Sequence, residues 1–389
     1  MKLDAALREL RAPGEAESLD RARGPLRRAF LERERVPAPA RRPWKLALGV
    51  ALLALVAAAL SPPGMAVLDS LRDAVGRDRL LRQPVLTRLP AKGRLLVMSS
   101  NGPWIVRENG AKRRLGDYDD ASWSPHGLFV VATRGRELVA LTPGGDVRWT
   151  VPSRAPVRHP RWAPSGFRIA YLSGSTLRVV VGNGTGDRLL SPSAADIAPA
   201  WRPGTARHVL AYFGADRRVR VVDTDRGTTS FTSRQIVHPV AVAWTADGTL
   251  AILDRTRLRL IRNGRIGGWP LFGARGISLA PAPAGDELAV VAFDPVQRLN
   301  ELFVVRLHGF RLIFASVGPF GGIAWSPDGR WLLLAWERDD QWLFFTTGRR
   351  ARRVVPLSSV ERQFGSARGA STSVPQPLGW CCAPSGSAG

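Results

Sequence analysis

Short runs of apolar and β-branched residues recur along most of the chain, usually in pairs separated by turn residues. The runs are about four to six residues long and are bounded by Gly, Pro, Asn and Asp, a pattern that predicts β-strands joined by tight turns. Apart from its N-terminal part, the chain is therefore expected to be all-β. The expected strand pairs are 94–98 with 104–107, 129–132 with 137–141, 168–171 with 177–181, 208–212 with 219–222, 250–253 with 258–261, 288–293 with 302–307, and 331–336 with 342–345.

A short phrase precedes each of these pairs except the first. Its clearest copy is Trp-Ser-Pro-Asp-Gly at 325–329. Proline presets a turn, and Asp-Gly or Ser-Gly supplies a residue that tolerates positive φ. The first position holds a large apolar residue, which we expect to pack one repeat against the next. These marker residues are Trp123, Trp162, Trp201, Trp244, Leu279, Trp325 and Trp380.

The marker residues are 35 to 55 residues apart, and most spacings are near 40. Repeats of this length are typical of β-propeller blades. The strand pairs predict seven four-stranded blades; six is the alternative, because 279–307 is the least regular stretch. The C-terminal strand has no blade behind it, and the N-terminal blade has no marker strand, so their pairing would close the ring and remove exposed sheet edges. We expect the propeller to span 91–383, followed by a flexible C-terminus at 384–389.

The repeated Trp-Ser-Pro-Asp-Gly phrase resembles the TolB-like, WD-repeat-like β-propellers of bacterial envelopes, over about three quarters of the chain. It departs from true WD40 repeats, because no Trp-Asp dipeptide ends a strand and no Gly-His dipeptide opens a blade. The layout, with an apolar segment ahead of the repeats, is similar to that of uncharacterised actinobacterial membrane proteins with WD40-like repeats. The resemblance implies a binding or scaffolding surface and no particular reaction, since propellers host many unrelated functions.

An almost uninterrupted apolar run covers 44–60, with Lys45 as its only charge. The 15 residues from Leu46 to Leu60 would rise about 22 Å as a helix, and flanking residues extend this towards the roughly 30 Å of a hydrocarbon core. We predict an uncleaved transmembrane helix at 44–62, and favour it over a signal peptide because 43 residues precede the run. A buried core helix is a weaker alternative. The anchoring residues are Leu46, Leu48, Val50, Leu52, Leu53, Leu55, Val56 and Leu60.

Charge beside this segment predicts its orientation. Six arginines between positions 27 and 42 lie closely before it and Lys45 lies at its start, against three basic residues in the twenty residues after it. Positive charge stays in the cytoplasm, so we expect the N-terminus inside the cytoplasmic membrane and the propeller outside it. Residues 63–90 would form a juxtamembrane stalk. Residues 1–43 would form a cytoplasmic tail with short amphipathic helices, which either only sets the topology or docks a cytoplasmic partner.

The formal net charge of +24 raises the question of a polyanionic partner. Only four of the 56 basic residues are lysines, and the arginines are scattered over predicted strands. No DNA-binding module is recognisable, so specific nucleic-acid binding is not expected. A solvated surface is the favoured interpretation, and contact with anionic lipid headgroups or acidic wall polymers is the alternative.

Candidate catalytic residues are sparse. The histidines occur singly, without the spacing of metal ligands, and no nucleophile elbow, phosphate loop or dinucleotide fingerprint is present. The glycine-rich stretch 182–186 and the acidic stretch 223–227 are interpreted as turns between strands. We therefore expect no enzymatic activity, cofactor or metal. The five histidines are His126, His159, His208, His238 and His308.

The only two cysteines, Cys381 and Cys382, are adjacent in the predicted closing strand. Neighbouring strand residues point to opposite faces, so a bond between them requires a local turn. Two small side chains, at least one of them buried, are the favoured interpretation, and a vicinal disulfide is the alternative. The sequence as a whole predicts a membrane-anchored, extracytoplasmic propeller that binds an envelope protein as a scaffold or sensor. The alternatives are polyanion binding and a non-catalytic subunit of an envelope enzyme.

Overall fold

The computed structural model describes residues 86–382, except 205–206, 308, 349–352 and 366–372. By its internal contacts the chain divides into the units Met1–Ala66 and Val67–Gly389, and all described residues belong to the second unit. The predicted tail at 1–43, the predicted helix at 44–62 and most of the predicted stalk lie outside the described residues, as does 384–389. Within the described part, no helix is both long and apolar enough to span a lipid bilayer.

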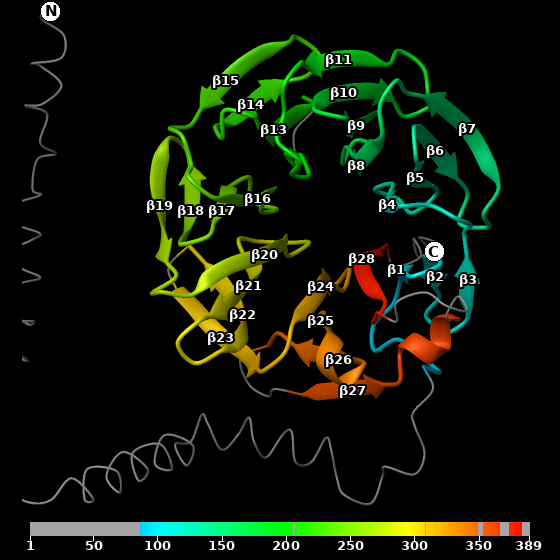
Figure 1. Ribbon diagram of the computed structural model, residues 1–389, viewed down its shortest axis with the longest axis vertical. Helices are drawn as coiled ribbons and strands as arrows, with labels where there is room; N and C mark the ends of the chain where they lie inside the picture. The colour runs from blue at the N-terminus through cyan, green and yellow to red at the C-terminus, as the bar shows by residue number, and fades with distance from the viewer. Residues whose placement is uncertain (1–85, 205–206, 308, 349–352, 366–372, 383–389) are drawn as a thin grey trace, which may run out of the picture. The chain divides into compact units, whose positions relative to one another are not determined.

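The described strands form seven antiparallel sheets of four strands each, and the sheets follow one another around a ring (Figure 1). We call the sheets blades 1 to 7. The predicted seven-bladed, all-β propeller is confirmed, and the six-bladed alternative is wrong. The irregular sequence pattern near 279–307 belongs to a complete blade whose strands are seven or eight residues long, which are the longest described.

The strands have the following bounds. Blade 1 contains β28 (Gln376–Cys381), β1 (Arg94–Ser99), β2 (Gly102–Val106) and β3 (Lys112–Arg114). Blade 2 contains β4 (Asp120–Trp123), β5 (Val130–Arg134), β6 (Glu137–Leu141) and β7 (Val147–Pro152). Blade 3 contains β8 (Val157–Trp162), β9 (Arg168–Ser173), β10 (Thr176–Val181) and β11 (Arg188–Ser191). Blade 4 contains β12 (Ala200–Trp201), β13 (Val209–Phe213), β14 (Val219–Asp223) and β15 (Thr228–Thr232).

The remaining blades follow the same order. Blade 5 contains β16 (Pro239–Trp244), β17 (Leu250–Asp254), β18 (Arg257–Arg262) and β19 (Arg265–Pro270). Blade 6 contains β20 (Arg275–Pro281), β21 (Leu288–Asp294), β22 (Leu299–Arg306) and β23 (Gly309–Ser316). Blade 7 contains β24 (Phe320–Trp325), β25 (Trp331–Trp336), β26 (Gln341–Thr346) and β27 (Val354–Ser358). Two 3₁₀ turns, η1 (Glu337–Asp339) and η2 (Glu361–Phe364), lie in the same part of the chain.

Each blade presents its turns on two opposite faces of the ring. The first strand of every blade lies innermost, and the fourth lies at the periphery (Figure 1). Because the strands are antiparallel, the turns after the first and third strands emerge on one face. We call this the marker face, since it carries the repeated phrase. The turns after the second strand, and the connections between blades, emerge on the opposite face, which we call the linker face.

The repeated phrase forms a tight turn between the first and second strands. In blade 2, the N–H of Gly127 donates to Ser124 O at 2.9 Å, and Ser124 Oγ accepts the N–H of Phe129 at 2.9 Å. Gly127 has φ of 64°, the left-handed conformation that glycine adopts without steric penalty. The hydroxyl therefore satisfies a backbone N–H that the turn would otherwise leave without a partner, and Ser326 does the same for Trp331 N in blade 7.

The ring is closed by strands from the two ends of the described chain. The C-terminal strand β28 (red in Figure 1) pairs antiparallel with β1, which places Trp380 opposite Leu95 and Cys381 opposite Arg94. Trp342 in blade 7 is fully buried, and its indole N–H donates to Pro375 O, just before β28, at 2.7 Å. Trp342 also packs against Phe364, with ring centroids 5.3 Å apart. Closure therefore depends on the core of blade 7 as well as on the pairing of β28 with β1.

We expect Trp342→Ala to lower the free energy of unfolding by about 3–5 kcal/mol, because it opens a cavity beside the closing strand. The measurement is urea-induced unfolding of the full-length protein, followed by intrinsic fluorescence and circular dichroism. Phe272→Ala is the control: its side chain is 79% exposed, so we expect a change within about 0.5 kcal/mol. Equal effects of the two substitutions would contradict this account of closure.

Candidate functional site

Three marker tryptophans link neighbouring blades through their indole N–H groups. In each case the acceptor is a backbone carbonyl in the innermost strand of the preceding blade. These bonds tie the inner strands together close to the axis of the ring, at the blade 3–4, 4–5 and 6–7 junctions. The donors and acceptors are Trp201 Nε1 to Arg161 O (2.8 Å), Trp244 Nε1 to Ala200 O (3.2 Å) and Trp325 Nε1 to Ala280 O (3.0 Å).

Trp162 makes a different bond. Its indole N–H donates to Gly166 O of its own marker turn at 2.9 Å, and not to the inner strand of blade 2. The ring stacks on Phe129 of the neighbouring blade, with centroids 6.2 Å apart and an interplanar angle of 14°. Trp149, from the outer strand of blade 2, donates its indole N–H to Gly182 O of blade 3 at 3.1 Å. The junction between blades 2 and 3 is therefore held by the Trp149 hydrogen bond and by the stacking of Trp162 on Phe129. A gap remains between these two contacts.

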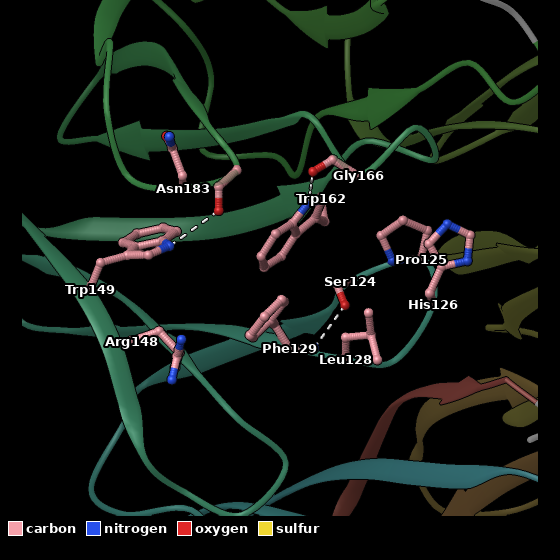
Figure 2. Close-up of a pocket in the computed structure, with 11 residues that line it drawn as sticks. Ser124, Pro125, His126, Leu128, Phe129, Arg148, Trp149, Trp162, Gly166 and Asn183 are labelled. Carbon is pink, nitrogen blue, oxygen red and sulfur yellow. Dashed lines mark hydrogen bonds between the residues drawn. The ribbon is translucent and has the colours of Figure 1, made fainter.

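The open junction forms a pocket of about 380 Å³ on the marker face (Figure 2). Three aromatic side chains supply most of its apolar wall, and Arg148, His126 and Asn183 supply polar groups. No carboxylate side chain lines it. Figure 2 shows the two indoles, Phe129 and the hydrogen bonds that fix Trp149 and Trp162. We call this the aromatic pocket, after Phe129, Trp149 and Trp162.

Two exposed apolar residues accompany the pocket. Leu128 is 63% exposed and lines it, and Phe167, which follows the pocket residue Gly166, is 65% exposed. Single exposed apolar residues are ordinary on protein surfaces. Apolar side chains grouped beside an aromatic cavity are more typical of an interaction site. The arrangement can accept an apolar side chain and, through Arg148, a negatively charged or hydrogen-bond-accepting group.

The sequence pattern located only part of this pocket. Trp162 was predicted as a marker residue, and Phe129 as the start of a strand. Trp149 and Arg148 were missed, because the fourth strand of each blade was not among the expected pairs. The only signal for it was the alternation of Val147, Trp149 and Val151 in β7.

The marker positions differ in burial. Trp201, Trp244, Trp325 and Trp380 are buried, whereas Trp123, Trp162 and Leu279 are half-buried. Trp123 lies under the Arg94 guanidinium, 5.1 Å from its ring centroid. The indole nitrogens of Trp123 and Trp380 have no hydrogen-bond partner among the described residues. The indole bridge is therefore a feature of particular junctions and not of every copy of the phrase.

Two histidines pair with carboxylates. His159 Nε2 lies 3.1 Å from Asp196 Oδ1, and His208 Nδ1 is hydrogen-bonded to an oxygen of Asp225. His126 lines the aromatic pocket, His238 is exposed, and His308 lies outside the described residues. No group of three or more His, Cys, Asp or Glu side chains that could hold a metal ion occurs in the part of the chain that the structure describes.

Five exposed arginines gather on the linker face of blades 4 to 6. Backbone hydrogen bonds connect their segments: Arg255 N donates to His238 O at 3.0 Å, and Gly276 N to Arg255 O at 2.9 Å. The nearby carboxylates Asp216 and Asp254 are already paired with other arginines. None of the five has an ion-pair partner within the described ranges. This linker-face arginine cluster consists of Arg217, Arg234, Arg255, Arg257 and Arg275.

Cys381 and Cys382 form a disulfide bond at the end of β28, which is the alternative that the sequence left open. Their sulfur atoms lie 3.7 Å from Ser124 O and 3.1 Å from Pro125 O. A bonded sulfur carries no hydrogen, so these are packing contacts and not hydrogen bonds. The disulfide therefore rests on the marker turn of blade 2, whose Ser124 and Pro125 also line the aromatic pocket.

Comparison with known proteins shows the fold. No protein-family model matches the sequence, and no curated protein matches it. The solved structure of KlHsv2 with loop 6CD replaced by a Gly-Ser linker is similar, with a TM-score of 0.52 and 13% identity over 69% of this chain and 94% of that chain. A chain of the mitotic checkpoint complex has a TM-score of 0.50 and 13% identity over 62% of this chain and 80% of that chain.

The C-terminal WD40 domain of Sif2 is also similar in structure, with a TM-score of 0.48 and 15% identity over 66% of this chain and 79% of that chain. At such identities the likeness concerns architecture alone. The strand topology of this chain is that of a seven-bladed β-propeller, and the likeness to KlHsv2 agrees with that architecture. Propellers host many unrelated functions, so the fold alone does not show what this chain binds.

We expect the folded, unreduced protein to contain no thiol that reacts with iodoacetamide. After unfolding and reduction, both Cys381 and Cys382 should be alkylated, because the structure joins them to each other. Peptide mass spectrometry of the C-terminal fragment measures this directly. Alkylation of either cysteine in unreduced, denatured protein would contradict the disulfide.

Proposed function

We propose that this protein is a protein-binding scaffold whose aromatic pocket receives an apolar side chain of a partner polypeptide. The observation that carries the proposal is the open junction between blades 2 and 3, where Trp162 does not bridge to the preceding inner strand. Trp149 and Trp162 are held by hydrogen bonds to backbone carbonyls. A pocket with fixed walls loses little conformational freedom when a ligand enters, which favours affinity.

The pocket has the composition of a binding hot spot. Aromatic residues and arginine dominate the energetics of protein interfaces, and here Phe129, Trp149, Trp162 and Arg148 lie together. Its volume of about 380 Å³ is at the lower end of ligand pockets, which suits one large side chain better than an extended ligand. Arg148 would pair with a backbone carbonyl or a carboxylate of the partner next to that side chain.

We further propose that the apolar segment at 44–62 anchors the protein in the cytoplasmic membrane, with the propeller outside. The charge difference across the segment supports this orientation. The disulfide supports it as well, because disulfides persist in oxidising compartments. An anchored propeller would hold its partner at the cell envelope, or relay its occupancy to the predicted cytoplasmic tail.

A second candidate function is the binding of a polyanion, such as a wall polymer or lipid headgroups. The linker-face arginine cluster favours it, because its five guanidinium groups are exposed and have no carboxylate partner among the described residues. Such binding would weaken strongly with salt, since it depends on exposed charges. It uses the opposite face of the ring, so substitutions in the aromatic pocket should leave it unchanged.

The pocket is tested with short peptides selected from a displayed random library on the full-length protein. We expect the selected peptides to carry an aromatic or large aliphatic residue. Leu128→Glu combined with Arg148→Glu should weaken their binding at least tenfold, equivalent to about 1.4 kcal/mol, as measured by fluorescence anisotropy. Val296→Glu is the matched control, because Val296 is 87% exposed on the linker face. Equal binding to the pocket variant and to wild type would exclude the pocket as the site.

The anchor is tested by fractionating cells that express the full-length chain. Wild-type protein should stay in the membrane pellet after an alkaline carbonate wash. Leu52→Arg with Leu55→Arg should release it, because each arginine disfavours insertion by roughly 3 kcal/mol at the centre of a helix. Leu3→Arg with Leu7→Arg, in the predicted tail, should stay in the pellet. Soluble wild-type protein would overturn the proposed anchor.

A further inference from the structure

Ser165, His208 and Asp225 form a hydrogen-bonded chain on the marker face. Ser165 Oγ lies 2.9 Å from His208 Nε2, and His208 Nδ1 is hydrogen-bonded to Asp225 Oδ2. Ser165 belongs to the marker turn of blade 3, His208 directly precedes β13, and Asp225 lies in the turn between β14 and β15. The site is thus built across the junction of blades 3 and 4, from segments that are far apart in sequence.

The order of these contacts sets the proton positions. Asp225 is an acceptor when ionised, so His208 Nδ1 carries the hydrogen and Nε2 is free to accept the Ser165 hydroxyl proton. A hydroxyl bonded to a base that is itself oriented by a carboxylate is the arrangement of an activated serine nucleophile. Sequence reasoning missed it, because Ser165 and Asp225 were assigned to turns, and nothing in the sequence showed that His208 lies between them.

The carboxylate and the imidazole are both held in place. Arg168 contacts Asp225 Oδ1 through Nε at 3.1 Å and Nη2 at 3.0 Å, which leaves Oδ2 for the histidine. Burial by itself would raise the pKa of Asp225, but the hydrogen bond and charge of His208, together with the charge of Arg168, hold that pKa below its ordinary value. His208 is 14% exposed at its side chain and packs edge-on against Trp201, with centroids 6.4 Å apart. The base therefore has one orientation, towards Ser165.

The serine, in contrast, is open to solvent. Ser165 is exposed, and the marker turn around it is closed by the bond from Gly166 N to Ala163 O at 2.9 Å. The backbone N–H of Ser165 donates no hydrogen bond to any other described residue. It is available to an oxygen that develops negative charge beside Oγ. Phe167, 65% exposed two residues on, offers an apolar surface for an acyl group.

We propose that Ser165 is a nucleophile for acyl transfer from carboxylic esters that reach the marker face, with His208 as general base and Asp225 as a positioning residue. Ser165 Oγ bonds to the ester carbonyl carbon while its proton moves to His208 Nε2. The bond from that carbon to the alkoxy oxygen breaks, and the alcohol leaves with the proton. A water oxygen then bonds to the acyl carbon while one of its protons moves to His208 Nε2. The bond from that carbon to Ser165 Oγ breaks, Oγ takes the proton back from His208, and the carboxylic acid leaves. No cofactor or redox partner is needed, and none of the three residues lines the aromatic pocket, although Ser165 adjoins the pocket residue Gly166.

Reactivity separates this proposal from a purely structural link between blades 3 and 4. The full-length, folded protein is treated with a fluorophosphonate probe, and the modified residue is identified by peptide mass spectrometry. We expect modification of Ser165 and its loss in Ser165→Ala. His208→Gln should slow modification by about 100-fold or more, the usual contribution of a general base. Ser175→Ala, at an exposed serine in the turn between β9 and β10, should leave the rate unchanged.

Two further measurements distinguish a loss of reactivity from a loss of folding. Asp225→Asn should slow modification and Asp225→Glu should restore part of the rate, while circular dichroism reports whether each variant is folded. Wild-type protein in denaturant should lose the modification, because the reactivity depends on the assembled blades. An unmodified Ser165 in the folded wild-type protein would overturn the proposal. So would a rate that is the same in His208→Gln, or the same in denaturant.

Discussion

The structure depends on how each innermost strand is attached to the one before it. At three junctions a buried marker tryptophan makes this attachment with one indole hydrogen bond to a backbone carbonyl. The indole ring also fills the space between the blades. The same side chain therefore supplies both apolar packing and a directional hydrogen bond. Where Trp162 turns its N–H to its own marker turn, the inner strands lose this bond and the junction opens into the aromatic pocket. The candidate site thus lies at a junction that lacks the indole bridge and is held by other contacts of Trp149 and Trp162.

Closure of the ring and the candidate site share residues. The closing strand β28 ends in the disulfide of Cys381 and Cys382, which packs on the carbonyl groups of Ser124 and Pro125. Those two residues form part of the pocket wall. The last strand of the propeller therefore supports the turn beside which a ligand would bind, which couples the integrity of the closed ring to the shape of the pocket.

The two faces of the ring carry different chemistry. The marker face holds the aromatic pocket and the chain from Ser165 through His208 to Asp225, whereas the linker face holds the arginine cluster. On the marker face, the turns after the first and third strands place small polar residues and aromatic residues close together. The connections between blades extend over the second face, which carries the linker-face arginine cluster.

The architecture could be predicted from the amino-acid sequence alone. A phrase recurring about every 40 residues, paired apolar runs and unmatched ends were sufficient for seven blades and their closure, because turns and strands are local and the ring only repeats them. The transmembrane helix at 44–62 stays a prediction. Only the tertiary structure decided which indole bridges a junction and which leaves it open, since that depends on two blades facing each other. The same holds for Ser165, 43 positions before His208: it reaches the pair of His208 and Asp225 in blade 4 only because blades 3 and 4 are adjacent.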